Sequence, residues 1–406
     1  MVLLQQLPPQ GSSTLTSIKA FLKKEIVLVV AVLLALLSTI FCGPSVYTYS
    51  SIDLNTLLLL FSLMCVMQAF SKIGFFENCG KKLLALVKGD KGLLLVLVLL
   101  PFFFGMFITN DVALITFVPF AVIVLKLAGK EKLLVKVIVL QTIAANLGSM
   151  MLPMGNPQNL YLYNISGLTL GDFVITMLPY TVVALLLLVI CVLCMKGSGK
   201  IDEKSVCSDE KSSSEKDSSA ISSAAVKSNP LSLSKSSSYI AFTLLFIFSL
   251  LAVLKMVSVP KAFAVTLVFF LIFDRSILLR VDYSLLLTFV GFFVFVGNLK
   301  GLDSFSSFLG SILAGNEILL SVGLSQIISN VPAALLLSGF TENYKDILIG
   351  VNIGGLGTLI ASMASLISWK QVEKDKGKYL LTFTLMGLMF LAVLVVLKVI
   401  LNFAGV

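Results

Sequence analysis

Residues 144–159 read AANLGSMMLPMGNPQN and interrupt an apolar run that extends from 133 to 160. Glycine and proline at this density break an α-helix, because glycine costs backbone entropy and proline lacks the N–H donor. Irregular backbone at membrane depth is tolerated only where it is buried in protein or lines a cavity. The stretch therefore predicts a transmembrane helix that is broken in a polar interior.

The rest of the sequence is strongly apolar. Of the 406 residues, 58% are hydrophobic and only 13% are charged, whereas soluble domains carry about 25% charged residues. Several apolar runs reach the roughly 17–25 residues that span a bilayer, and the short alternating segments of a membrane β-barrel are absent from the sequence. The composition predicts an all-α polytopic membrane protein. The apolar runs fall at about 25–42, 54–70, 92–128, 133–160, 172–195, 239–257, 262–279, 284–299, 318–340, 346–368 and 379–402.

The net charge of +9 does not indicate a nucleic-acid partner. Lysines gather in short loops between apolar runs, as expected for the cytoplasmic side of a membrane protein, and the only arginines are Arg275 and Arg280. The lysines before the first run predict a cytoplasmic N-terminus at 1–24, and the loop at 43–53 has no Lys or Arg, so we expect it outside.

The chain contains no histidine, which excludes the His-Glu-x-x-His zinc site and Ser/His nucleophilic catalysis. The Gly-x-Gly-Asp motif of intramembrane aspartyl proteases is also absent. We therefore expect neither an enzyme nor a cofactor, and the lipid bilayer is the partner that the composition predicts.

The run at 92–128 begins and ends beside lysine-bearing loops, with only Thr109-Asn110-Asp111 at its middle. Either two full transmembrane helices or one re-entrant hairpin would begin and end on the same side of the membrane, as these loops require. An exposed turn between full spans normally has several Gly, Asn, Ser or Pro residues, so we favour a hairpin whose tip stops inside the membrane. A second such hairpin is expected at 319–340, LLSVGLSQIISNVPAALLLSGF.

A second broken helix is expected at 350–365, GVNIGGLGTLIASMAS. Asn146 then corresponds to Asn352, and Asn110 of the first hairpin to Asn330 of the second. Hairpin and broken helix thus occur twice. Because one extra helix, at 239–257, lies between the two halves, the second pair is expected to have the opposite orientation in the membrane. Chance similarity between Gly-rich membrane helices is the plainer alternative, but the same order of two features in both halves favours an inverted repeat.

We expect four segments: a cytoplasmic N-terminus at 1–24, a first membrane repeat at 25–195, a disordered Ser-rich cytoplasmic linker at 196–238, and an extra helix plus the second repeat at 239–406. Inverted repeats with paired discontinuous helices are typical of secondary transporters, whose sites lie near the midplane where the repeats meet.

The two Gly-rich segments, together with TNDVALITFVP at 109–119, resemble the ion transporter superfamily. That superfamily includes the arsenical pump permease, citrate-transporter-like proteins, sodium/dicarboxylate symporters and one sodium/proton antiporter family. The resemblance covers roughly 25–195 and 239–402 and is closest to the anion-permease branch. It implies an elevator-like motion of hairpins and broken helices against a scaffold that is often dimeric, so a homodimer is expected.

The sodium/dicarboxylate members carry Ser-Asn-Thr at each hairpin tip, and the resemblance implies that the threonine hydroxyls help to hold carboxylates. In this sequence Asp111 and Val331 stand at the two threonine positions, which disfavours citrate or a dicarboxylate as substrate. No ATP-binding signature is present in the sequence, so an ATPase like that of the arsenical pump would be a separate chain.

Half-helix N-termini suit an anion, and unwound carbonyls with Asn oxygens suit Na⁺. A first site is expected from Thr109, Asn110, Asp111, Asn146, Gly148, Gly155, Asn156 and Asn159. A second is expected from Ser329, Asn330, Asn352, Gly354, Gly355, Thr358, Ser362 and Ser365. Na⁺ would bind near Asn110, Asp111 and Asn156.

Asp111 has two interpretations. Asn and Asp are favoured N-caps, so it could start a helix at 112–128. Because Asn110 would cap without the cost of burying a charge, we favour a carboxylate that binds a cation or a proton.

The predicted function is secondary active transport of a small anion, an inorganic oxyanion or an organic carboxylate, coupled to H⁺ or Na⁺ across the plasma membrane. The alternatives are a Na⁺/H⁺ antiporter of the same superfamily or, less favoured, a channel.

Overall fold

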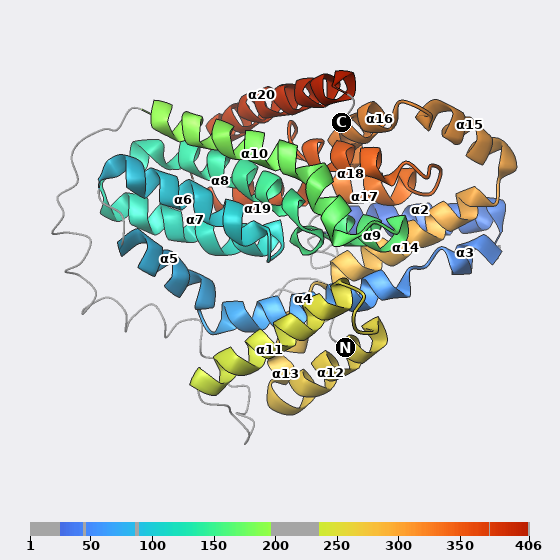
Figure 1. Cartoon of the computed structure of the whole chain (residues 1–406), viewed down its shortest axis with the longest axis horizontal. Helices are drawn as coiled ribbons and strands as arrows, with labels where there is room; N and C mark the ends of the chain where they lie inside the picture. Colours follow the sequence, from blue (N-terminus) through green and yellow to red (C-terminus); the bar gives the residue numbers. More distant parts are fainter. Residues whose placement is uncertain (1–24, 44–45, 86–88, 196–234, 373, 405–406) are drawn as a thin grey trace, which may run out of the picture.

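The structure is a computed structural model, and it describes residues 25–43, 46–85, 89–195, 235–372 and 374–404 (Figure 1). Every regular element in these ranges is helical, which confirms the predicted fold class. The predicted N-terminal segment 1–24 and most of the predicted linker lie outside the described residues. The helix after the linker begins at Lys235, so its first four residues fall within the segment that was expected to be linker.

The helices of the first half are α2 (Ile26–Cys42), α3 (Val46–Ser50), α4 (Leu54–Lys72), α5 (Phe75–Ala85), α6 (Asp90–Gly105), α7 (Asn110–Leu127), α8 (Leu134–Gly148), α9 (Pro157–Ser166) and α10 (Leu170–Cys194). Short 3₁₀ turns cover 131–133, 149–151 and 153–155.

The helices of the second half are α11 (Lys235–Val253), α12 (Val259–Phe273), α13 (Arg275–Leu278), α14 (Tyr283–Lys300), α15 (Asp303–Leu313), α16 (Glu317–Ile328), α17 (Asn330–Leu337), α18 (Tyr344–Ile353), α19 (Met363–Gln371) and α20 (Lys376–Phe403).

Local sequence explains several helix boundaries. Asp53 caps α4 by accepting a hydrogen bond from the Thr56 backbone N–H at 3.2 Å. Thr169 and Asp172 form a capping box at the start of α10. Gly167 takes φ +68° after α9, a left-handed conformation that glycine adopts without strain. These signals fix where the helices around the break begin and end.

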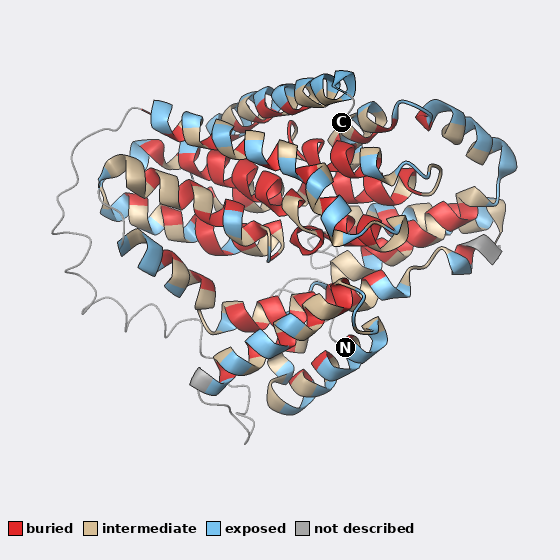
Figure 2. Cartoon of the chain, viewed as in Figure 1, coloured by how far each residue is buried: buried red, intermediate tan, exposed pale blue. Residues whose placement is uncertain are grey.

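The helices form two groups (Figure 1). In the first group α6 packs on α8, α16 on α18, and α10 and α20 both pack on α8. In the second group α11 and α12 pack on α4, while α2 packs on α14. The groups meet where α4 contacts α9 and where α14 contacts α17. Figure 2 shows that buried residues concentrate in the first group, along α8, α17 and α18, whereas α20 is largely exposed.

Six helices in the described residues are long and apolar enough to cross a membrane, or seven if α15 and α16, bent by 109°, count as one span. Of the 18-residue apolar window in the segment Glu131–Met151, 83% is buried by the protein, whereas only 22% of that in Lys376–Phe403 is buried. An apolar helix with so little protein around it is suited to contact lipid, so α8 is central and α20 peripheral.

Both predicted breaks are present. The helix α8 ends at Gly148 and α9 begins at Pro157, while α18 ends at Ile353 and α19 begins at Met363. The two hairpins are also present, as α6–α7 joined at 106–109 and α16–α17 joined at Ser329. The order of elements from α4 to α10 recurs from α14 to α20; the inverted orientation and the re-entrant character of the hairpins stay predictions.

Candidate functional site

Four helices begin inside the first group without a side-chain cap. They are α7 after Thr109, α9 after Asn156, α17 after Ser329 and α19 after Ser362. The first N–H groups of a helix have no partner within it, and the end carries a partial positive charge. Four such ends in one region make it attractive to an anion.

Asn146, near the end of α8, joins two of these helix ends. Its Oδ1 accepts a hydrogen bond from Asn110 Nδ2 at 3.0 Å and another from Ser362 Oγ at 2.9 Å. Its Nδ2 donates to Ser365 Oγ at 3.4 Å. All four side chains are buried. The tip of the first hairpin and the start of α19 therefore share one amide, although they lie in different halves of the chain.

Ser149 extends this network across the break. Its hydroxyl donates to the Asn146 carbonyl at 3.0 Å and accepts from Asn156 Nδ2 at 2.7 Å. The Ser149 carbonyl accepts from Asn159 Nδ2 at 3.3 Å. Ser149 was absent from the sequence-predicted site. A serine in a Gly-rich segment gives no distinctive signal, but its position three residues after Asn146 places both on one helical face.

Asn352 completes the network from the second broken helix. Its Nδ2 donates to Asn159 Oδ1 at 2.7 Å and to the Leu348 carbonyl at 2.8 Å. The pairing is reciprocal, because Asn146 reaches Ser365 in the second half while its counterpart Asn352 reaches Asn159 in the first. The two predicted sites are therefore joined into one, and each broken helix contributes to both ends of it.

Two buried oxygens in this network have no hydrogen-bond partner among the described residues. They are the side-chain oxygens of Asn156 and Asn352. A buried amide oxygen without a donor costs about 1–3 kcal/mol, and amide oxygens are ligands that Na⁺ and other hard cations prefer. These two atoms are the positions in the network best suited to a cation.

The glycines of the first break allow backbone to pack against backbone. A Cβ added to Gly148 would lie 2.0 Å from the Phe102 carbonyl oxygen, and one added to Gly155 would lie 2.1 Å from the Ser149 carbonyl oxygen. Gly148 thus lets α6 pack closely on α8, and Gly155 lets the unwound segment approach Ser149. Both were predicted as binding residues, and that role stays a prediction.

The tip of the second hairpin is strained. Ser329 takes φ +77° and ψ +155°, a region populated almost entirely by glycine. The Asn330 backbone N–H donates to the Ala361 carbonyl at 2.9 Å, just before α19. A Cβ on Gly355 would approach Asn330 Nδ2 to 3.0 Å. The second tip thus sits on the second broken helix, as the first tip sits on Asn146.

Gln326 of α16 holds the unwound segment of the second break. Its Nε2 donates to the carbonyls of Gly354 at 2.7 Å and Leu356 at 2.8 Å. Its Oε1 accepts from the Thr358 N–H at 2.9 Å, and its own carbonyl accepts from the Thr358 hydroxyl at 3.1 Å. Gly354 and Thr358 were predicted as site residues, but their polar groups are committed to Gln326.

Asp111 and Thr109 lie beside the buried network, and both are partly exposed. The helix α7 begins at Asn110, with Asp111 in its first turn, so the predicted helix start at 112 was two residues late. Asp111 is not the N-cap; that position is Thr109, and Asn110 Oδ1 accepts from the Asp111 N–H at 2.9 Å. No described residue forms an ion pair with the Asp111 carboxylate.

Comparison with known proteins shows the family to which the chain belongs. The family model described as "Citrate transporter" matches residues 18–343. The chain belongs to the citrate transporter family. This confirms the expected resemblance to citrate-transporter-like permeases and places the chain among integral, multi-pass membrane transporters.

Relatives of this citrate transporter family member point to transport as well. An uncharacterized transporter of Methanocaldococcus jannaschii is 32% identical over 85% of this chain and 89% of its own. The inner membrane protein YbiR of Escherichia coli (strain K12) is 29% identical over 80% of this chain and 81% of its own. A silicon efflux transporter of Oryza sativa subsp. japonica is 31% identical, but only over 36% of this chain and 30% of its own.

Proposed function

We propose that the chain is a secondary active transporter, not an enzyme, that moves a small anion coupled to H⁺ or Na⁺ and needs no cofactor. The observation that carries this proposal is the meeting of the N-termini of α7, α9 and α19 on the hydrogen-bond network of Asn146 and Ser149, with the start of α17 bonded to Ala361, directly before the N-cap of α19. Backbone N–H groups and dipole ends bind an anion without a buried basic side chain. The substrate class is an inorganic oxyanion or an organic carboxylate.

The coupling cation would bind the free oxygens of Asn156 and Asn352, next to the anion. A cation beside the anion reduces the charge that must cross the membrane, where moving one charge through 100 mV is worth about 2.3 kcal/mol. Asp111, at the edge of the network, is the group we propose to load a proton or help to bind Na⁺. The reciprocal contacts of α7 with α19 and of α9 with α17 support a pair of related repeats and an elevator-like motion.

A transport screen in proteoliposomes tests the proposal directly. Arsenite, citrate, sulfate, phosphate and Na⁺ would be offered separately, with imposed pH or Na⁺ gradients. Asn146→Ala leaves two buried donors unpaired, at about 1–3 kcal/mol each, so uptake is expected to fall at least about tenfold. Asn402→Ala, an exposed asparagine at the end of α20, serves as the matched control. Full uptake by the Asn146 variant would refute the site.

Asp111→Asn tests the coupling group. Uptake driven by a pH gradient is expected to be lost in this variant, because an amide cannot load a proton at physiological pH. Coupling that stays unchanged would remove Asp111 from the mechanism.

A Na⁺/H⁺ antiporter is the second candidate, favoured by the two free amide oxygens in the network and by an acidic residue, Asp111, next to Asn110. It would dissipate a Na⁺ gradient in the absence of any anion. A carrier of either kind saturates and shows counterflow, which separates it from a channel. We further propose a plasma-membrane location with a cytoplasmic N-terminus and a homodimeric scaffold; a separate ATPase chain would show as ATP-dependent uptake.

A further inference from the structure

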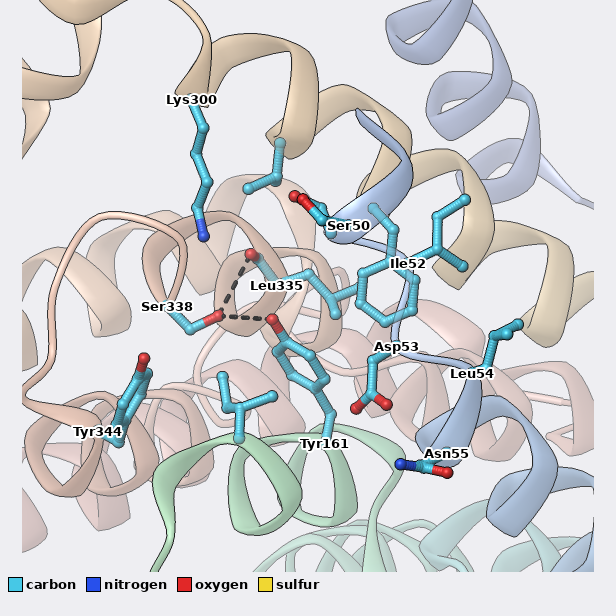
Figure 3. Close-up of a pocket in the computed structure, with 14 residues that line it drawn as sticks. Ser50, Ile52, Asp53, Leu54, Asn55, Tyr161, Lys300, Leu335, Ser338 and Tyr344 are labelled. Atoms are coloured by element: carbon cyan, nitrogen blue, oxygen red, sulfur yellow. Dashed lines mark hydrogen bonds between the residues drawn. The ribbon is translucent and has the colours of Figure 1, made fainter. Parts of the chain in front are cut away.

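A cavity of about 600 Å³ lies where the two helix groups meet, apart from the network around Asn146 (Figure 3). The end of α14 and the start of α4 form one side, and α9, α17 and the start of α18 form the other. None of the site residues expected from the sequence lines it. Residues 50–53, the end of the segment that the charge pattern predicts to be outside, line it as well.

Lys300, the last residue of α14, extends its side chain into one end of this cavity (Figure 3). The residue is half-buried, and none of the ion pairs among the described residues includes it. A partly buried charge without a counter-charge is costly. A bound anion would remove that cost, so the cavity is poised to accept one.

Three hydroxyl groups surround the same end. The Ser338 hydroxyl, at the end of α17, has a single hydrogen and two acceptors within reach, the Tyr161 hydroxyl oxygen at 3.1 Å and the Leu335 carbonyl at 3.3 Å. When Ser338 donates to the Tyr161 oxygen, which is the shorter of its two contacts, the Tyr161 hydrogen is left to donate to a ligand. The Tyr344 hydroxyl faces the cavity from the start of α18 (Figure 3). One ammonium and two tyrosine hydroxyls therefore act as donors.

The one acidic residue that lines the cavity, Asp53, does not cancel this charge. Its carboxylate is used as the cap of α4, where it accepts hydrogen bonds from the Thr56 backbone and hydroxyl. In Figure 3 it lies on the other side of Tyr161 from Lys300. The Lys300 end of the cavity is thus locally cationic, because the carboxylate of Asp53 is occupied as the N-cap of α4.

We propose that this cavity is a second anion-binding site, distinct from the network around Asn146. It takes a small oxyanion or carboxylate, with Lys300 as the counter-charge and Tyr161 and Tyr344 as hydrogen-bond donors. Because Lys300 belongs to one helix group and the tyrosines to the other, a bound anion bridges the groups and stabilises the arrangement seen here.

Binding would be measured by calorimetry on the purified full-length protein in detergent, with inorganic phosphate and citrate as separate probes at constant ionic strength. Lys300→Gln is expected to weaken binding about tenfold or more, because hydrogen bonds to charged groups are the stronger class. Lys300→Arg keeps the charge and is expected to stay within about threefold of the wild type. Lys345→Gln, an exposed lysine beside Tyr344, is the matched control and is expected to change nothing.

A second measurement does not depend on replacing Lys300. Asn55, an exposed residue that lines the cavity, would be replaced by cysteine, and its reaction with a membrane-impermeant maleimide would be followed with and without each probe. Phosphate or citrate is expected to slow labelling several-fold. The unsubstituted chain, with its own cysteines, gives the background.

These measurements show whether the cavity binds an anion and of which class. Slowed labelling by phosphate alone or by citrate alone identifies the class of anion and supports the site. Equal affinity of Lys300→Gln and the wild type, or labelling that neither probe slows, would overturn it. The inference is independent of the transport proposal, since Asn146→Ala is expected to lose uptake and keep binding in this cavity.

Discussion

Replacing Gly148 with alanine tests the contact that places the break of the first half. The added Cβ would lie 2.0 Å from the Phe102 carbonyl oxygen and 2.7 Å from its carbonyl carbon, whereas real Cβ contacts essentially never fall below 3.0 Å. Both partners are backbone of packed helices, so α6 and α8 must separate by about 1 Å or more. Overpacking of this kind costs about 1–3 kcal/mol and occasionally more.

Gly323→Ala is the matched control for this change. Gly323 lies inside α16 with nothing within 4 Å of the added Cβ, so the substitution is expected to stabilise the helix by up to about 1 kcal/mol. Thermal unfolding of both variants in detergent would be compared with the wild type. We expect a lower midpoint for Gly148→Ala and an unchanged or higher one for Gly323→Ala. Equal stability of the two variants would show that α6 does not pack on α8 as described.

Three further results are expected. Ser329→Gly relieves the positive-φ strain at the second hairpin tip and should raise stability by about 1 kcal/mol, seen as a higher unfolding midpoint; a lower midpoint would argue against the strain. Gln326→Leu strips the hydrogen bonds from the second unwound segment and should speed hydrogen exchange there without affecting the first; unchanged exchange would contradict the role given to Gln326. Although partial burial raises the pKa of Asp274, hydrogen bonds from Lys72 and Ser276 and the Lys72 charge lower it below its ordinary 3.8. The resulting stability, at most about 1 kcal/mol for so exposed a pair, is present above that value and lost as the pH falls below it, so the wild type and Asp274→Asn should converge in acid.

The breaks and hairpin tips could be predicted from the sequence because their residue types differ from those of the apolar runs around them. Pro157 sits at the first position of α9, where its missing N–H does no harm. Asn110 interrupts an apolar run together with Thr109 and Asp111, and it is buried with Asn146 as its partner. Such departures from a uniform apolar pattern are visible without any knowledge of packing.

The partners of these residues could not be predicted. The sequence grouped Asn146 only with its own half, whereas the structure pairs it both with Asn110 of that half and with Ser362 and Ser365 of the other. Partner choice depends on how two distant helices pack, and no local periodicity reports that. Gln326 shows the same limit: the sequence placed a glutamine in an apolar helix, but its bonding to an unwound segment needs the fold.

The reciprocal pairing has a consequence for biogenesis. Asn146 and Ser365 are separated by 219 positions in the sequence, and Asn352 and Asn159 by 193. The first half leaves the ribosome before the groups that complete its polar centre have been synthesised. Its membrane helices must therefore wait in the bilayer, with their central amides only partly paired, until the last hundred residues insert. Assembly of the transport core is then a late step, and the two halves expressed as separate chains would depend on one another to mature.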